Sequence, residues 1–237
     1  IPGKEGQEQA GIYAQAFRLL DAVSMFGALV AGLLLPIFSK MIKQREHVGE
    51  MAKLAYTLLI VPAIVVAVSS VYYDGEIMSL LYKSNTAYSS DILGILMIGF
   101  IGIATTYIFG TLLTANGSLK QLNIMAFSGM VLNVVLNLIL IPKLQAYGSA
   151  YASLSTQLFT GAAQLILALV IFRLKPGFIF IIQLFAFTGV TIVLAVLTKN
   201  MDNWIYGYFT MIAGSVLFAF IIRLISIRDM FKIILYK

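Results

Sequence analysis

The sequence contains no cysteine and a single histidine, and charged residues make up only 11% of its 237 residues. Without cysteine the chain can form neither a disulfide nor a thiolate metal site, and His47 alone cannot build a metal centre. The sequence also has no pair of closely spaced carboxylates and no glycine-rich phosphate loop followed by Lys-Ser or Lys-Thr. We therefore expect no enzymatic activity, no ATP hydrolysis and no cofactor.

Long apolar runs are what the chain has in abundance. Hydrophobic residues make up 60% of it, against roughly 45–50% in soluble proteins. Residues 92–115 and 147–172 contain no charge, and about 18 such residues suffice to predict a membrane span. The sequence predicts an all-α membrane protein with seven transmembrane helices joined by short connections. The expected spans are 11–39, 50–73, 90–115, 121–141, 147–172, 178–198 and 203–226.

Lysine and arginine gather in alternate connections, which predicts the orientation. Eleven of them fall in 40–53, 116–120, 173–177 and 223–237, whereas the other side has only Lys4, Lys83, Lys143 and Lys199. The first set is therefore expected in the cytoplasm, together with the C-terminus, and 223–237 could lie amphipathically along the inner surface. Seven spans place Ile1 outside, without a targeting segment before it. We therefore expect the chain to be the C-terminal part of a longer protein.

Three stretches carry a family resemblance when they are taken together, in order and at matching spacing. The first is GIYAQAFRLLD at 11–21 with LLPIFS at 34–39, and the second is LLTANGSLK at 112–120. The third is NVVLNLILIP at 133–142 with YGSAYAS at 147–153. The chain resembles the polysaccharide flippases of the multidrug/oligosaccharidyl-lipid/polysaccharide exporter superfamily over about residues 11–153.

The resemblance implies the C-terminal lobe of a fourteen-helix, two-lobed flippase. Residues 1–237 would form one transmembrane domain, with 11–172 as core helices of that lobe and 178–237 as two additional helices and a cytoplasmic tail; the N-terminal lobe is absent. The implied function is to flip a polyprenyl-diphosphate-linked oligosaccharide across the cytoplasmic (inner) membrane by alternating access, with Na⁺ or H⁺ coupling. The expected partners are this glycan lipid, membrane lipid and the missing lobe, and no nucleic acid.

Arg18 and Asp21 are the charged residues inside the first expected span. An ionised side chain in a membrane is costly and usually functional. We expect Arg18 to line a cavity and bind a diphosphate through its planar fork of donors. Asp21 could bind a proton or cation. The alternative is that Arg18 extends to the outer headgroups with Asp21 as its i,i+3 partner.

Two polar groups in later spans are further candidates. Asn133 and Asn137 lie one turn apart on one helix, and the next helix brings Ser153 to a similar depth, so their oxygens could coordinate Na⁺. The favoured alternative is hydrogen bonding between helices. Thr105, Thr106 and Tyr107 could contact sugar hydroxyls, or only neighbouring helices. Trp204, Tyr206 and Tyr208 are expected to form an aromatic belt at the outer boundary.

Two other functions remain open at this stage. A cation-coupled drug or metabolite exporter of the same superfamily would need a carboxylate-bearing cavity, and no expected span contains a glutamate in its interior. A membrane-embedded assembly subunit without transport activity would have no need of inward-facing polar residues on several helices.

Overall fold

A computed structural model describes residues 3–83 and 87–225, and these residues contain helices and no strand. Seven of the helices are long and apolar enough to cross a membrane, which confirms the predicted all-α membrane protein. Helix α3 is too short to do so. The helices are α1 (Lys4–Lys43), α2 (Gly49–Tyr72), α3 (Asp74–Leu81), α4 (Ala87–Ala115), α5 (Leu119–Leu144), α6 (Ala146–Ile171), α7 (Phe178–Lys199) and α8 (Trp204–Ile221).

The structure differs from the expected boundaries in two places. Helix α1 begins at Lys4 and not near residue 11, because 4–10 consists mostly of Lys, Glu and Gln, which favour a helix without being apolar. Residues 74–89 were expected to be a connection, yet they contain α3, whose eight residues are too few for a span. Most of the expected amphipathic tail, residues 226–237, lies outside the described residues.

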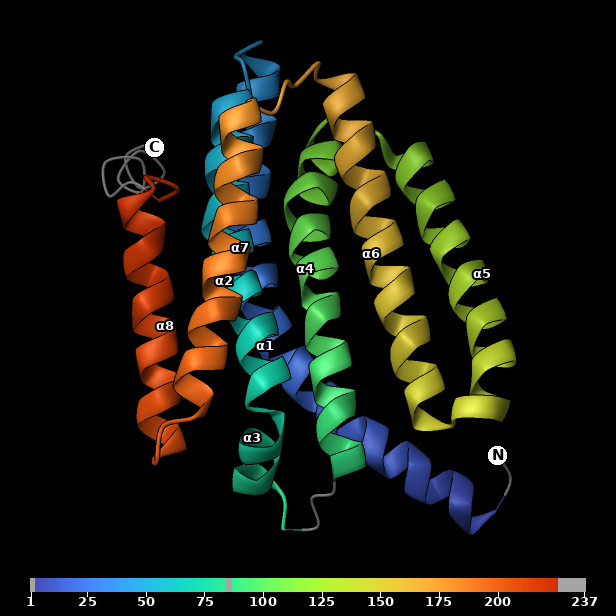
Figure 1. The fold of residues 1–237 in the computed structure, drawn as a ribbon. Helices are drawn as coiled ribbons and strands as arrows, with labels where there is room; N and C mark the ends of the chain where they lie inside the picture. Colours follow the sequence, from blue (N-terminus) through green and yellow to red (C-terminus); the bar gives the residue numbers. More distant parts are fainter. Residues whose placement is uncertain (1–2, 84–86, 226–237) are drawn as a thin grey trace.

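Helix α4 is the centre of the bundle and contacts α1, α2, α3, α5 and α6 (Figure 1). About two thirds of the most apolar stretch is buried in α2 and in α4, against 6% in α5. Helix α5 packs mainly on α6 at one edge, and the α7–α8 hairpin packs on α2 at the other edge. The outer faces of α5, α7 and α8 are therefore apolar surfaces suited to lipid.

Glycine allows α4 and α6 to cross at backbone contact. A Cβ on Gly102 would lie 2.4 Å from the carbonyl oxygen of Gln157, and a Cβ on Gly161 would lie 2.6 Å from the carbonyl oxygen of Gly102. Helices α5 and α6 approach in the same way, because a Cβ on Gly148 would lie 2.6 Å from the Leu140 carbonyl oxygen. Small residues at these points give the close packing that holds helices together in lipid.

The α7–α8 hairpin is attached to α2 and α3 by Tyr73, whose side chain is fully buried. The Tyr73 hydroxyl donates a hydrogen bond to Thr198 Oγ1 at 2.9 Å. The Lys199 ammonium lies 5.1 Å from the centre of the Tyr73 ring and forms a 2.5 Å ion pair with Glu76. The hairpin therefore has a polar attachment at this end of the bundle.

The residues expected to form an aromatic belt separate into two environments. Tyr208 packs edge-on against Tyr73 at 5.5 Å between ring centres, and Trp204 packs against Tyr208 at 6.5 Å. Tyr206 is 69% exposed. Only Tyr206 therefore has the open setting typical of a belt residue, while Tyr208 and Trp204 also help to attach the hairpin.

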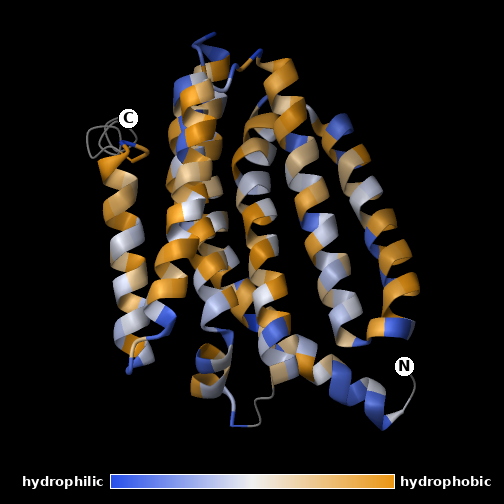
Figure 2. Ribbon diagram, in the orientation of Figure 1, coloured by the Kyte–Doolittle hydropathy of each residue, from blue (hydrophilic) through white to orange (hydrophobic). Residues whose placement is uncertain are grey.

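Hydrophilic residues gather toward both ends of the bundle (Figure 2), and the two ends differ in charge. The end where α1, α4, α6 and α8 finish carries Lys40, Lys43, Arg45, Lys53, Lys120, Arg173, Lys175 and Arg223 with only Glu46 and Glu50 among the described residues. We call it the basic end. The opposite end, here called the acidic end, carries Glu5, Glu8, Asp74, Glu76, Asp91 and Asp202 against Lys4, Lys83, Lys143 and Lys199.

Replacing Gly102 by Ala should destabilise the bundle, because the new methyl group would meet the Gln157 backbone at 2.4 Å. We expect a loss of about 1–3 kcal/mol, typical of overpacking, measured as a lower midpoint of thermal unfolding by circular dichroism in detergent. The control is Gly189→Ala in α7, where nothing lies within 4 Å of the added Cβ. That variant should unfold at the same or a higher temperature. Equal midpoints for Gly102→Ala and wild type would contradict the contact.

Replacing Asp74 by Asn should change how stability depends on pH. Burial raises the pKa of Asp74, and the negative charges of Asp91 and Glu76 act in the same direction. The folded state therefore holds this proton more tightly than the unfolded chain. This contribution to stability is present below the usual carboxyl pKa of about 4 and is lost as the pH rises through the raised value.

The asparagine of this variant would still offer a side-chain oxygen to the Gly75 N–H, which in the wild type donates to Asp74 Oδ1 at 2.7 Å. We therefore expect Asp74→Asn to unfold at the same or a higher temperature than wild type at pH 7. The difference should shrink below about pH 4. A wild type that is more stable than the variant at pH 7 would show that the ionised carboxylate is favoured instead.

Candidate functional site

Arg18 lies within the apolar layer of the bundle, by which we mean the zone between the basic end and the acidic end. It lies in the part of this layer nearer to the acidic end. Gly27 of α1 touches the ring of Tyr107 in α4, since a Cβ on Gly27 would lie 2.4 Å from the ring. Arg18 precedes Gly27 by nine residues, so it lies at most about 13.5 Å nearer to the acidic end. The same distance back along α4 from Tyr107 reaches Ile98, which lies in the uncharged run that follows Asp91.

The face of α1 that carries Arg18 is not covered by any described residue. The buried positions of α1 recur at intervals of three, four or seven and turn toward α4; they are Ala16, Leu20, Gly27, Leu34, Phe38 and Met41. Arg18 is exposed on the opposite side. Its neighbours on that side are apolar and between 67% and 70% exposed: Met25, Phe26, Leu29 and Leu33.

Asp21 lies on the flank of the same helix and forms no ion pair with Arg18 among the contacts of the described residues. The carboxylate is close enough to Tyr13 and to Tyr107 to interact electrostatically with both. Tyr13 is hydrogen-bonded to Ser153 of α6 at 2.8 Å and stacks on Phe17 at 5.6 Å between ring centres. Asp21 is exposed and lies at the edge of a polar strip between α1 and the α4–α6 pair, formed by Tyr13, Ser153 and Tyr107.

The residues predicted as one polar patch on α4 turn to different neighbours. The Tyr107 ring packs on Gly27 of α1. Thr105 donates to the Ile101 carbonyl at 2.8 Å and lies 3.5 Å from the Tyr56 hydroxyl of α2. The Thr106 hydroxyl is buried without a hydrogen-bond partner. Of the three, only Tyr107 is shown to lie near the charged residues of α1.

Buried side-chain oxygens without a hydrogen-bond partner occur on α1, α4 and α6. Besides Thr106 Oγ1, they are Ser24 Oγ on α1 and Gln164 Oε1 on α6. Gln164 faces Gly110 of α4, because a Cβ on that glycine would lie 2.5 Å from Oε1. Such atoms are costly in an apolar interior unless a water or ligand supplies the missing hydrogen bond. Ser24 was not singled out from the sequence, although it follows Asp21 by three residues and so shares its side of the helix.

The asparagine pair forms hydrogen bonds between α5 and α6. Asn137 Nδ2 donates to Asn133 Oδ1 at 3.0 Å, and Asn133 Nδ2 donates to Thr156 Oγ1 at 3.2 Å. Ser153, which was grouped with them, is bonded to Tyr13 of α1 instead. The structure therefore brings Asn133, Asn137 and Thr156 together and places Ser153 in the polar strip of α1.

A hydrogen-bonded cluster at the acidic end has no counterpart in the sequence-based expectations. Tyr88 at the start of α4 donates to Gln9 of α1 at 2.8 Å, and the Ala146 N–H of α6 donates to the Tyr88 hydroxyl at 3.1 Å. Tyr147 donates to Asp91, and its ring lies edge-on to Tyr88 at 4.6 Å between ring centres. Three segments far apart in the sequence are thereby held together at the acidic end.

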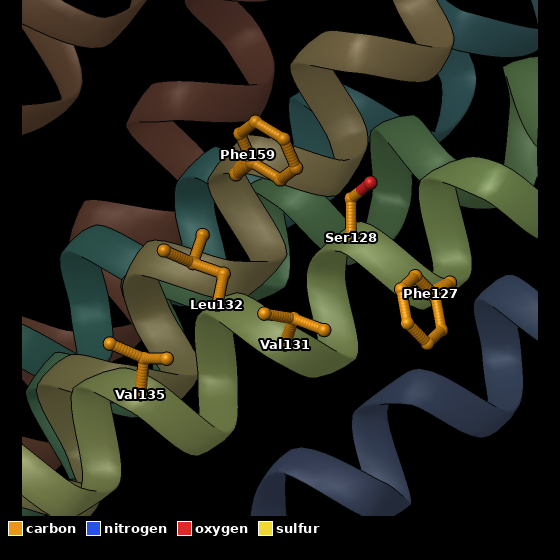
Figure 3. A pocket seen from close by; sticks show the side chains of 6 residues that line it. All are labelled: Phe127, Ser128, Val131, Leu132, Val135 and Phe159. Carbon is orange, nitrogen blue, oxygen red and sulfur yellow. The ribbon is translucent and has the colours of Figure 1, made fainter.

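An apolar groove of about 470 Å³ lies between α5 and α6 (Figure 3). Its walls are almost entirely hydrocarbon, so it is suited to a lipid chain and offers little to a polar ligand. In the described residues no group of three or more His, Cys, Asp or Glu side chains could hold a metal ion. The groove is lined by Phe127, Ser128, Val131, Leu132, Val135 and Phe159.

Comparison with known proteins does not identify the chain. No model of a known protein family matches it, and no curated protein matches it either. The flippase resemblance therefore stays a prediction from the three sequence stretches.

Replacing Asn137 by Leu distinguishes a packing contact from a cation site. Because its amide already binds Asn133, we expect the variant to lose about 0.6 kcal/mol of stability. The unfolding midpoint of the wild type should be the same in NaCl and in KCl. Val134→Leu, at an exposed position of the same helix, controls for the added side-chain volume. A midpoint that rises with Na⁺ in the wild type but not in Asn137→Leu would instead favour a sodium site.

Proposed function

We propose that the chain forms the second lobe of a transporter that flips a polyprenyl-diphosphate-linked oligosaccharide across the cytoplasmic membrane. The observation that carries this proposal is the placement of Arg18 within the apolar layer, on a face that no described residue covers. The three sequence stretches that resemble polysaccharide flippases supply the class of substrate. The proposal requires the N-terminal lobe opposite α1, with the basic end of the bundle in the cytoplasm.

Electrostatics favours a polar cavity at this face over lipid alone. A guanidinium at the centre of a bilayer costs roughly 2.5–3.5 kcal/mol on insertion scales, and less nearer to the surface. Among the described residues Arg18 has no ion-pair partner to offset this cost. Asp21, Tyr13 and the unpaired Ser24 hydroxyl add polar groups to the adjoining flank. Water between α1 and the N-terminal lobe would hydrate these groups, and an anionic ligand there would pair with Arg18.

Arg18 is suited to the diphosphate because its guanidinium offers two parallel N–H donors to two phosphate oxygens. In the proposed mechanism the diphosphate binds Arg18 while the polyprenyl chain stays in lipid. Rocking of the two lobes then exposes the site alternately to each side of the membrane. Tyr107 and Tyr13 would contact the first sugars, and Asp21 would take up the proton or cation that resets the cycle.

Replacing Arg18 by Ala in the full-length protein should abolish flipping. Depletion of the protein and the Arg18→Ala variant should both trap polyprenyl-diphosphate glycans on the cytoplasmic leaflet of the protein's own cells. We expect a loss of at least about tenfold, since a hydrogen bond to a charged group contributes about 1.5–3 kcal/mol. Arg18→Lys should restore activity only in part, because lysine lacks the planar fork.

The matched control is Lys43→Ala, which removes a positive charge from the basic end of the same helix. It should leave flipping near the wild-type rate at equal expression. Glycan accumulation on depletion but not in Arg18→Ala would support the proposed flipping activity. It would also show that Arg18 is not needed for flipping and is only an interfacial charge. If neither condition traps glycans, a small-molecule exporter becomes the better proposal.

A further inference from the structure

Three helices finish at the basic end with an arginine in the left-handed region of the backbone. These arginines are Arg45 after α1, Arg173 after α6 and Arg223 after α8, with φ of 57°, 51° and 55°. In each case the arginine N–H donates to the carbonyl three residues before it, and the next N–H donates to a carbonyl five residues back. The three helices therefore share the Schellman ending.

Glycine is the usual residue at this position, because a side chain is disfavoured in the left-handed region. Helix α4 follows that rule at the same end of the bundle. Gly117 has φ of 75°, its N–H donates to Thr114 O at 2.9 Å, and Ser118 N–H donates to Leu113 O at 3.0 Å. The turn itself thus does not need arginine, and an unfavourable backbone conformation retained three times points to a use for the side chain.

The three side chains are not buried, and the structure records no ion pair for them within 3–83 and 87–225. A helix C-terminus favours positive charge, but residues in the last turn already supply it in α1, through Lys40 and Lys43. Helices α6 and α8 have no basic residue in their last turn, but a lysine or arginine inside that turn would complement the dipole without left-handed strain. The helix dipole therefore does not require an arginine at the strained position. Each arginine lies two residues beyond the end of a helix that is long and apolar enough to span a membrane. We therefore expect all three at the level of the lipid headgroups.

We propose that Arg45, Arg173 and Arg223 bind the phosphates of anionic phospholipids at the basic end of the bundle. The guanidinium matches a phosphate with two parallel hydrogen bonds and gives up its hydration more easily than an ammonium does. Lys120 and Lys175 at the same end add to the attraction as further positive charges. This binding goes beyond the proposed flipping activity and holds whichever substrate the transporter carries.

The test replaces all three arginines by glycine in the full-length protein. Glycine keeps the left-handed turn without strain and removes only the side chain. Thermal unfolding is followed by circular dichroism in detergent, with added phosphatidylglycerol or phosphatidylcholine. Phosphatidylglycerol should raise the wild-type midpoint and phosphatidylcholine should not. The triple Gly variant should lose most of this rise, with an affinity for phosphatidylglycerol lower by on the order of 100-fold, because each basic residue contributes about fivefold.

The same variant separates lipid binding from a structural role. In phosphatidylcholine its midpoint should equal or exceed that of wild type, since the strain is relieved. Arg→Lys at all three sites should keep part of the phosphatidylglycerol effect. The charge-matched control replaces Lys4, Lys83 and Lys143 at the acidic end by Gln, and it should keep the whole effect.

Two outcomes would overturn the proposal. One is a triple Gly variant that responds fully to phosphatidylglycerol, or that is destabilised equally in both lipids. The other is a rise in midpoint with a polyprenyl diphosphate but none with phosphatidylglycerol, which would assign the three arginines to the carried substrate. Glycan flipping is measured separately, so failure of either proposal leaves the other intact.

Discussion

The bundle depends on the backbone contact between α4 and α6 at Gly102 and Gly161. In lipid the hydrophobic effect does not drive helices together, so close packing at small residues has to do so. This contact joins α4, which packs against α1, α2 and α3, to α6, which packs against α5. Without it, α5 would have little to attach it, since Gly129 is its only buried residue among those described.

The sequence predicted the membrane spans well because hydropathy over a window is a local property. It missed α3, which is too short to raise that signal, and it could not tell which side of α4 each polar residue faces. Helix α4 is apolar all round, so no stripe marks a preferred side. Three consecutive residues such as Thr105, Thr106 and Tyr107 point about 100° apart in a helix. Their separation was therefore foreseeable, whereas their individual neighbours were not.

The candidate site was foreseeable in its charges but not in its surroundings. Arg18 and Asp21 are identified by charge alone within an apolar run. The contact of Tyr13 with Ser153 joins residues 140 positions apart, and the cluster around Tyr88 and Gln9 joins three helices. Such contacts depend on how helices cross, which no short sequence pattern records. The strained arginines were missed for a related reason, because arginine after a helix is ordinary in sequence and unusual only in its backbone angles.

The packing of Trp204 on Tyr208, which in turn packs on Tyr73, has a spectroscopic consequence. Trp204 is the single tryptophan of the chain, so all indole fluorescence originates at the start of α8. Its emission reports on the packing of the α7–α8 hairpin against α2, and tyrosine-to-tryptophan energy transfer from Tyr73 depends on the same packing. Detachment of that hairpin would be visible in emission while most of the helix content, and hence the far-ultraviolet dichroism, persists. Trp204 is therefore an intrinsic fluorescent probe of the packing of the α7–α8 hairpin on α2.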